Sequence, residues 1–202
     1  MTHINYQDII YETASKHYNV AEKYKDNTVE ENVNICKNNS LPFSVGTINI
    51  TGELNIGMMI RSACLFGAEK FYTFGRKKYD RRSTVGAENY IDIVQYTYDA
   101  PIHADESILH DLIELKKNTG CDVVICEQGG YELGTVDYEY VKQSFINPIF
   151  IFGSESFGVP EIIMENSRFH KVSIPQRGVL RSFNVSAAMN IIAWDYIKEK
   201  HL

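Results

Sequence analysis

The stretch from residue 171 to residue 197 constrains the fold of this chain more than any other. A short β-rich run, Lys171 to Ile174, ends at Pro175, which has no N–H to give to a strand ladder. A polar loop with one glycine follows, and Asn184 then stands as an N-cap before apolar residues at helical spacing (Val185, Ala188, Met189, Ile192 and Ile197). The pattern predicts a strand, a glycine loop and a capped helix.

This loop has two readings. An ordinary connection between a strand and a helix would have the same outline. However, Arg177 and Arg181 flank the turn and Ser182 stands two residues before the cap, which is more polar than a connector needs. Unpaired backbone groups beside the positive end of a helix favour ligand binding. We therefore expect part of a functional site here.

The rest of the chain alternates between strand and helix patterns. We predict further strands at 43–50, 70–74, 90–97, 122–127 and 148–152. Asn55 is expected to cap a helix that ends at Gly67, and a second helix is expected over 105–117. The alternation predicts an α/β fold, a mainly parallel sheet flanked by helices on both faces, with ligands at the carboxyl ends of the strands. Residues 1–40 are predicted to be a polar helical N-terminal extension, and residues 41–202 the main domain.

Composition limits the classes of protein that remain. Of the 202 residues, 44% are hydrophobic, and no apolar run approaches the ~20 residues of a membrane span. The first residues lack the basic and apolar regions of a signal peptide. The four cysteines form no CxxC pair, so we expect reduced thiols, a cytoplasmic location, and neither a zinc site nor any other metal.

Charge is unevenly distributed along this acidic chain. The formal net charge is −6, yet residues 61–82 hold seven basic and two acidic side chains, a net charge of +5. Screening confines the influence of each charge to about 8–10 Å, so a local patch can bind phosphates on an acidic protein. A solvated basic loop is the alternative. The candidate RNA-binding residues are Arg76, Lys77, Lys78, Arg81 and Arg82.

No glycine fingerprint of a dinucleotide-binding enzyme is present. Gly129-Gly130 follows a predicted strand, but no helical pattern begins directly behind it. A Rossmann-type enzyme that does not act on RNA is therefore disfavoured.

Three stretches together resemble the SpoU/TrmH class of SPOUT RNA 2′-O-ribose methyltransferases. They are Asn55-Ile56-Gly57-Met58-Met59-Ile60-Arg61-Ser62-Ala63, Gly153-Ser154-Glu155-Ser156-Phe157-Gly158-Val159-Pro160, and the run from Ile174 to Ser186. Each follows a predicted strand, and the resemblance covers about residues 43–198. Glu127-Gln128, Ile174 to Gly178 and Trp194-Asp195-Tyr196 look most like the eukaryotic-type branch that methylates the D-loop guanosine of tRNA.

The resemblance implies several features of the molecule. It implies a C-terminal deep trefoil knot, S-adenosylmethionine bound against that knot, and a homodimer whose interface shapes the active site. Asn55, Arg61, Glu155 and Asn184 match the family's polar active-site positions. The cofactor would be held by Ser182 and by backbone groups near Cys126, Gly153, Ile174 and Phe183. Phe183 stands where the family usually has Leu.

The chemistry of methyl transfer suggests roles for two of these residues. A guanidinium is always protonated and cannot accept a proton, so Arg61 is expected to clamp a phosphate and the developing alkoxide. Phosphate or water would then take the proton. Glu155 would orient Arg61 through a bidentate pair, unless it serves only as an acid near the start of the helix after Pro160. A side chain at Gly153 would intrude where the backbone must approach the cofactor closely.

The sequence therefore predicts a tRNA 2′-O-methyltransferase, with three alternatives open. An rRNA 2′-O-methyltransferase would carry the same motifs. A catalytically silent RNA-binding protein on this fold is disfavoured because Asn55, Arg61, Glu155, Ser182 and Asn184 are all present. The disfavoured Rossmann-type enzyme is the third.

Overall fold

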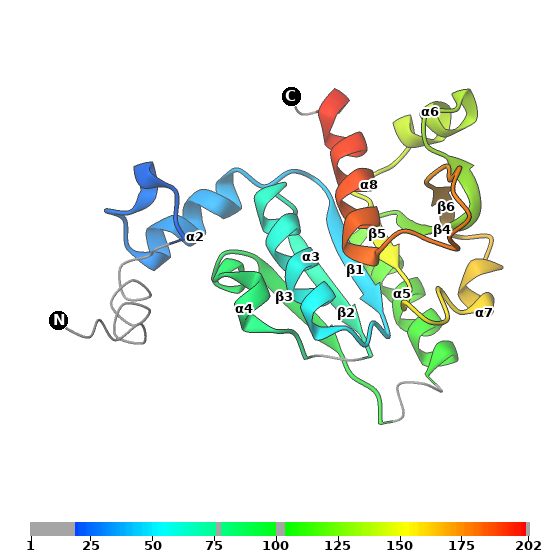
Figure 1. Cartoon of the computed structure of the whole chain (residues 1–202), viewed down its shortest axis with the longest axis horizontal. Coiled ribbons are helices and arrows are strands. Elements are labelled where there is room, and N and C mark those ends of the chain that lie inside the picture. The colour runs from blue at the N-terminus through cyan, green and yellow to red at the C-terminus, as the bar shows by residue number, and fades with distance from the viewer. Residues whose placement is uncertain (1–18, 76–77, 100–103, 201–202) are drawn as a thin grey trace.

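Six parallel strands form the single sheet of the computed structural model, which describes residues 19–75, 78–99 and 104–200 (Figure 1). Their order across the sheet is β3-β2-β1-β5-β4-β6. The strands are β1 (Ser44–Ile48), β2 (Lys70–Phe74), β3 (Asp92–Tyr96), β4 (Val123–Glu132), β5 (Ile149–Phe152) and β6 (His170–Ser173). Every pairing is parallel, which confirms the predicted sheet.

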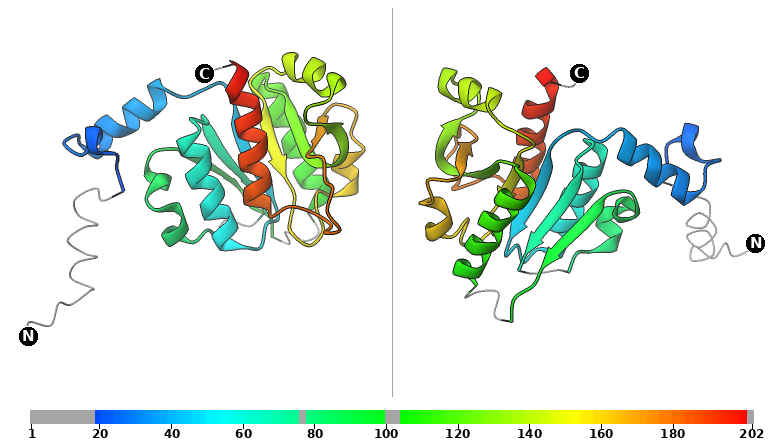
Figure 2. Two further views of the ribbon diagram at one scale, coloured as in Figure 1. Left: turned by 45° about the horizontal axis from the view of Figure 1, so that its top comes forward. Right: turned by 180° about the vertical axis from the view of Figure 1, so that it is seen from behind.

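Helices cover both faces of this sheet (Figures 1 and 2). On one face lie α3 (Glu53–Leu65) and α8 (Val185–Lys200), and on the other lie α5 (Asp105–Thr119) and α7 (Glu161–Met164). Phe71 and Tyr72 show how the strands serve both layers, because successive side chains of β2 enter different core clusters. The predicted α/β class is therefore confirmed.

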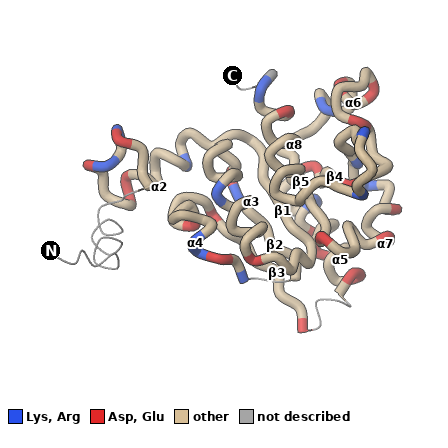
Figure 3. The backbone as a smooth tube through the Cα atoms, viewed as in Figure 1, with Lys and Arg blue, Asp and Glu red and all other residues tan. Residues whose placement is uncertain are grey.

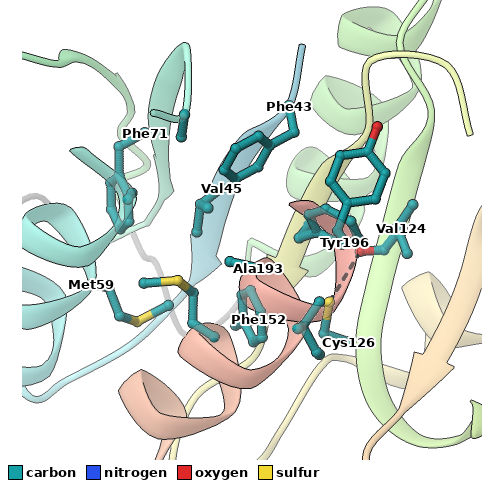
Figure 4. Packing of buried hydrophobic residues seen from close by; sticks show 14 of the residues in the cluster. Phe43, Val45, Met59, Phe71, Val124, Cys126, Phe152, Ala193 and Tyr196 are labelled. Atoms are coloured by element: carbon teal, nitrogen blue, oxygen red, sulfur yellow. Dashed lines mark hydrogen bonds between the residues drawn. The ribbon is translucent and has the colours of Figure 1, made fainter. Parts of the chain in front are cut away.

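The core beneath α3 and α8 is built mainly from large side chains. Figure 4 shows Phe43 and Val45 of the β1 region between Met59 of α3 and Tyr196 of α8. The Tyr196 ring lies 5.9 Å from the Phe43 ring and 5.3 Å from the Phe150 ring, both at tilted or edge angles. This packing fixes the two helices that carry motif residues.

Two local predictions were wrong. Asn55 is not an N-cap, because α3 already begins at Glu53 after Gly52. The strand predicted over 122–127 does not stop before the two glycines but continues to Glu132. A bulge separates its two pairings with β6, and a Cβ at Gly130 would lie 2.5 Å from the carbonyl carbon of Lys171. Glycine is needed there because the two backbones approach closely.

A buried polar cluster joins α6 (Val136–Gln143) to α8. The side chain of Lys142 is 1% exposed, and its Nζ lies 3.4 Å from Oδ2 of Asp195. Tyr138 donates its hydroxyl to the same carboxylate, and Lys198 lies 2.8 Å from Oδ1. Burial opposes ionisation of Asp195, but the hydrogen bonds from Lys198 and Tyr138 and the charge of Lys142 outweigh it, so the pKa of Asp195 is lowered.

The segment before the sheet begins with η1 (Glu22–Tyr24) and α2 (Val29–Asn38). Thr28 and Glu31 close a capping box at the start of α2, which projects to one side of the sheet in Figure 2. Two short helices, α4 (Arg81–Thr84) and η2 (Ala87–Asn89), link β2 to β3. Residues 1–18 lie outside the described residues, and the division of the chain at residue 40 stays a prediction.

Neither a membrane-spanning helix nor a metal-binding cluster of side chains occurs in the described ranges. No helix there is both long and apolar enough to cross a membrane. Within the same ranges, no three His, Cys, Asp or Glu side chains form a group that could hold a metal ion.

Candidate active site

The middle of β4 and the loops after β5 and β6 enclose a pocket of about 620 Å³, here called the β4–β6 pocket. Its walls include all five residues predicted to hold a cofactor: Cys126, Gly153, Ile174, Ser182 and Phe183. Glu155 and Asn184 also line it. Residues that the sequence separates by tens of positions are therefore gathered at one end of the sheet.

The lining of this pocket suits a nucleoside with a polar tail. Phe152, Ile174 and Val185 offer apolar surface, while Ser154 and Ser182 offer hydroxyl groups. The remaining lining residues are Glu127, Gln128, Gly158, Val172, Ser173, Gln176, Arg181, Ala188 and Ile192. Burial raises the pKa of the Cys126 thiol well above its usual range, so Cys126 contributes a neutral side chain and backbone groups.

A chain of hydrogen bonds connects the three motifs at the pocket rim. Asn55 donates from Nδ2 to Oε1 of Glu155 at 2.8 Å, and Asn184 donates from Nδ2 to Oδ1 of Asn55 at 3.1 Å. The Oδ1 atom of Asn184 accepts from the backbone N–H groups of Ser186 and Ala187, which confirms Asn184 as the cap of α8. The orientation of both amides is fixed by their partners.

The structure shows why Gly153 is glycine within its own loop, and the predicted close approach of a cofactor to this position stays a prediction. A Cβ at this position would lie 2.1 Å from the carbonyl carbon of Gly158 and 2.3 Å from the nitrogen of Val159. It would collide with the loop's own backbone, where Ser154 and Gly158 form a bridge. Glycine is therefore required to close the loop that forms this wall.

Arg61 lies away from the β4–β6 pocket of its own chain. It lines a second pocket of about 520 Å³, together with Arg81, Arg82, Tyr90 and residues 19 and 20 of the N-terminal segment. The predicted pair with Glu155 is not formed, because the Glu155 carboxylate instead accepts from Asn55 and from the backbone N–H of Thr51. Among the described residues, Arg61 has no hydrogen-bond or ion-pair partner. The exposed guanidinium remains available to a ligand or a second chain.

The alternative prediction, that Glu155 is an acid near the start of the helix after Pro160, is also wrong. The short helix α7 begins at Glu161, and its cap is Pro160. Glu155 lies in the preceding loop and is bonded to the start of α3 rather than to the start of α7. Its role is to join two motifs.

The basic segment is only partly described. Arg76 and Lys77 lie outside the described residues, whereas Lys78, Arg81 and Arg82 are exposed. Arg81 and Arg82 stand in α4 rather than in a loop, since Asp80 caps that helix and pairs with Arg82 at 2.8 Å. Blue backbone marks this segment beside α4 in Figure 3. These two arginines share the second pocket with Arg61.

The comparison of families decides the classification. The profile of the SpoU rRNA Methylase family matches residues 42–194, which is most of the chain. The chain belongs to this SpoU family. The resemblance recognised from the three motifs is thereby confirmed.

Individual SpoU relatives are distant. Over 152 residues the chain is 24% identical to the mouse (Mus musculus) protein named tRNA (guanosine(18)-2′-O)-methyltransferase TARBP1, a match that covers 73% of this chain and 9% of the relative. The chain therefore spans about a tenth of the length of that relative.

Solved structures share the fold at low identity. The A. aeolicus TrmH/SpoU tRNA modifying enzyme is 22% identical with a TM-score of 0.64, covering 85% of each chain. An AdoMet-bound rRNA methyltransferase from Sinorhizobium meliloti is 22% identical with a TM-score of 0.62, covering 79% of this chain and 57% of that one. At this identity the likeness establishes the SpoU fold.

Sequence reasoning missed several residues of the β4–β6 pocket. Glu127, Gln176 and Arg181 line it, although none was predicted to bind the cofactor. Glu127 did have a signal, because it directly follows Cys126, where the buried part of β4 and its pairing with β5 end. An acidic side chain in that position faces the ligand-binding edge of a parallel sheet.

Proposed function

We propose that this SpoU chain is an S-adenosylmethionine-dependent RNA 2′-O-ribose methyltransferase. The observation that carries the proposal is the β4–β6 pocket, whose rim holds the hydrogen-bonded Asn55, Glu155 and Asn184. S-adenosylmethionine supplies a methyl group on a positively charged sulfur. Ser182 and the backbone near Cys126, Gly153, Ile174 and Phe183 hold the cofactor.

The chain's polar groups then position the acceptor ribose. Asn55 and Asn184 keep amide N–H groups in fixed directions because their partners leave no freedom to flip. Such fixed geometry supplies much of the rate in a group transfer. Arg61 binds a neighbouring phosphate and the oxygen as it becomes negative, and phosphate or water accepts the proton.

A homodimer brings Arg61 to a cofactor pocket. Leu54, Met58 and Leu65 of α3 are 56%, 42% and 77% exposed, and they flank Arg61 at helical spacing. On the neighbouring α8, Ile191 and Trp194 are 37% and 50% exposed. A second copy that covers this apolar surface also covers Arg61, so Arg61 of one protomer serves the pocket of the other.

The proposal extends to the path of the chain and to the substrate. A trefoil knot formed by the segments from about Gly153 to Ala193 is supported by β6 at the sheet edge and by α8 returning to pack beside α3. A tRNA substrate, with the D-loop guanosine favoured, is supported by the name of the mouse relative. The rRNA acceptor is the second candidate, supported by the Sinorhizobium meliloti enzyme.

Mapping of 2′-O-methyl groups tests the proposal. Purified protein is incubated with S-adenosylmethionine and unmodified tRNA or rRNA, and modified positions are located by protection from alkaline cleavage. We expect one new protected ribose in tRNA and none with the Arg61→Ala variant. Protection in rRNA alone would move the substrate to rRNA. Tight RNA binding without any methylation would favour the silent RNA-binding protein.

A further inference from the structure

Glu127 is a carboxylate in the β4–β6 pocket to which no role has been assigned. It follows Cys126, the last residue of β4 that pairs with β5. The side chain is half-buried and lines the pocket between the middle of β4 and the loop after β5.

Two backbone donors hold this carboxylate in place. Oε1 accepts from the N–H of Gln128 at 3.0 Å, and Oε2 accepts from the N–H of Val159 at 3.3 Å. A Cβ at Gly158 would lie 2.6 Å from Oε2, so the carboxylate fits closely against that glycine. The second bond ties the middle of β4 to the opposite wall of the pocket.

Part of the acceptor capacity of Glu127 is unused. An ionised carboxylate accepts about four hydrogen bonds, and the bonds from Gln128 and Val159 each occupy one oxygen. The other pocket carboxylate differs, because Glu155 already accepts from Asn55 and Thr51 at the rim. Glu127 is thus the pocket's preorganised anionic acceptor.

We propose that Glu127 binds the two ribose hydroxyls of S-adenosylmethionine. A vicinal diol presents two donors at a spacing that two carboxylate oxygens match. Parallel sheets use the same solution elsewhere, with an acidic residue on the ribose of a nucleotide whose other parts contact glycine-rich backbone. The amino-acid end of the cofactor is a weaker partner, since its own carboxylate stands beside the ammonium group and repels a second anion.

The assignment makes Glu127 a selectivity residue. Hydrogen bonds to a charged acceptor are stronger than neutral ones, and a buried acceptor left without its donor costs further free energy. A nucleoside that lacks the hydroxyls should therefore bind much more weakly than one that has them. The difference should depend on the charge of Glu127.

Calorimetry with paired ligands tests this inference, which rests on the proposed use of the pocket for S-adenosylmethionine. The ligands are 5′-methylthioadenosine and its 2′,3′-dideoxy analogue, neither of which carries the amino-acid end. For the unmodified protein we expect a preference for the diol of about tenfold or more. In Glu127→Gln the preference should fall to a few-fold, and Glu161→Gln, on the exposed surface of α7, should leave it unchanged.

The outcomes distinguish binding of the ribose hydroxyls by Glu127 from its structural support of the loop that contains Val159. If Glu127→Gln weakens both ligands equally, Glu127 only holds the wall through Val159 and the inference is overturned. Equal binding of both ligands by the unmodified protein overturns it without any variant, even if Glu127→Gln fails to fold. If S-adenosylhomocysteine and both nucleosides fail to bind the unmodified protein, the assignment of the pocket itself is wrong.

Discussion

Asn184 donates a hydrogen bond to Asn55 across 129 positions of the sequence, with 3.1 Å between Nδ2 and Oδ1. The bond joins the cap of α8 to the first turn of α3, and Glu155 joins the same asparagine from the loop after β5. Three motifs thus share one chain of hydrogen bonds. The sequence shows only that the three motifs occur in one protein. The hydrogen bonds show that the motifs contact one another at one site.

This hydrogen bond predicts that a substitution at position 184 can lower methyl-transfer activity with little effect on the free energy of unfolding. Asn184→Asp keeps a good helix cap, so the free energy of unfolding should change by less than about 1 kcal/mol. It also places a second acceptor against Oδ1 of Asn55, which breaks the link, so methyl transfer should fall at least tenfold. Asn184→Ala loses the cap as well and should cost about 1 kcal/mol. Urea unfolding and a methyl-transfer assay measure the two effects. Full activity of the Asn184→Asp variant would show that the hydrogen bond between Asn184 and Asn55 is not needed for methyl transfer.

Arg61 should act on the partner's pocket. Arg61→Ala and Asn184→Asp homodimers should each be nearly inactive, and Arg61→Lys should be poor because an ammonium cannot replace a planar fork. Refolding the first two variants together yields heterodimers in which one pocket has both an intact Asn184 and an intact partner arginine. Activity should recover to about a quarter of that of the unmodified protein.

The matched control is each variant refolded alone. Because Arg61 is exposed and has no partner among the described residues, its removal should leave cofactor affinity and thermal stability nearly unchanged. If activity did not recover in a verified heterodimer, Arg61 would act on the pocket of its own chain rather than on the partner's pocket.

Gly153→Ala should damage the loop rather than merely crowd a ligand. The new Cβ would meet the backbone of Gly158 and Val159 within 2.1–2.3 Å, and backbone cannot swing aside as a flexible side chain can. We expect destabilisation of about 1–3 kcal/mol and weaker binding of S-adenosylhomocysteine. Gly178→Ala is the control, since a Cβ there would meet no atom within 4 Å. Equal effects of the two changes in urea unfolding would contradict the steric argument.

The Asp195 cluster predicts an acid-sensitive contribution to stability. The pKa of Asp195 is lowered in the folded chain, so its stabilisation is present above the unfolded pKa of about 3.9 and is lost as pH falls through the folded pKa. Asp195→Asn removes one of the two carboxylates beside the buried Lys142, whose Nζ still lies 2.6 Å from Oε2 of Glu139, and should cost about 1.5–3 kcal/mol at pH 7. Between about pH 5 and pH 3 the variant should lose less stability than the unmodified protein.

Lys198→Ala is the control for the cluster. Lys198 is 38% exposed, so removal of its ion pair with Asp195 should cost under about 1 kcal/mol. If urea unfolding showed the Lys198 change to be as costly as Asp195→Asn, burial of Lys142 would not be the source of the effect.

The sequence was sufficient for β1, β2 and β5 because these strands are largely buried runs between turn residues. Ile149 to Phe152 is continuously apolar and is fully buried in β5, and Lys70–Phe74 was predicted with its exact bounds. The end of β4 could not be predicted, because Gly129-Gly130 normally marks a turn. The close approach of β6 requires glycine at position 130, and the positive φ of 86° favours glycine at position 129.

Part of the candidate site could also be predicted from the sequence, and part could not. The five cofactor positions come together because the middle of β4 and the loops after β5 and β6 meet at one edge of the sheet. The partner of Glu155 could not be predicted, since Asn55 and Arg61 stand on the same helix and either could face it. Their positions on α3 decided the question: Asn55 lies in the first turn beside Glu155, whereas Arg61 lies farther along on the exposed stripe.

RNA should be held electrostatically by the segment that contains Arg81 and Arg82. Both side chains are largely exposed, at 80% and 91%, and they share a pocket with Arg61. Phosphate contacts give affinity rather than sequence choice, so Arg81→Ala/Arg82→Ala should weaken different RNA sequences to the same degree. The slope of log affinity against log salt should flatten by about 0.7–0.9 for each lost phosphate contact, with cofactor binding unchanged.

Two further proteins complete this test. Lys117→Ala/Arg168→Ala removes two exposed cations from other elements and should leave the salt slope as it is. Deletion of residues 1–38 addresses the competing view, in which the basic segment is only solvated and the N-terminal arm captures RNA. Because charge acts over about 8–10 Å at physiological salt, only cations near the bound backbone contribute to the slope. An unchanged slope in the Arg81/Arg82 variant, together with loss of binding in the deletion, would place the RNA contacts on the arm.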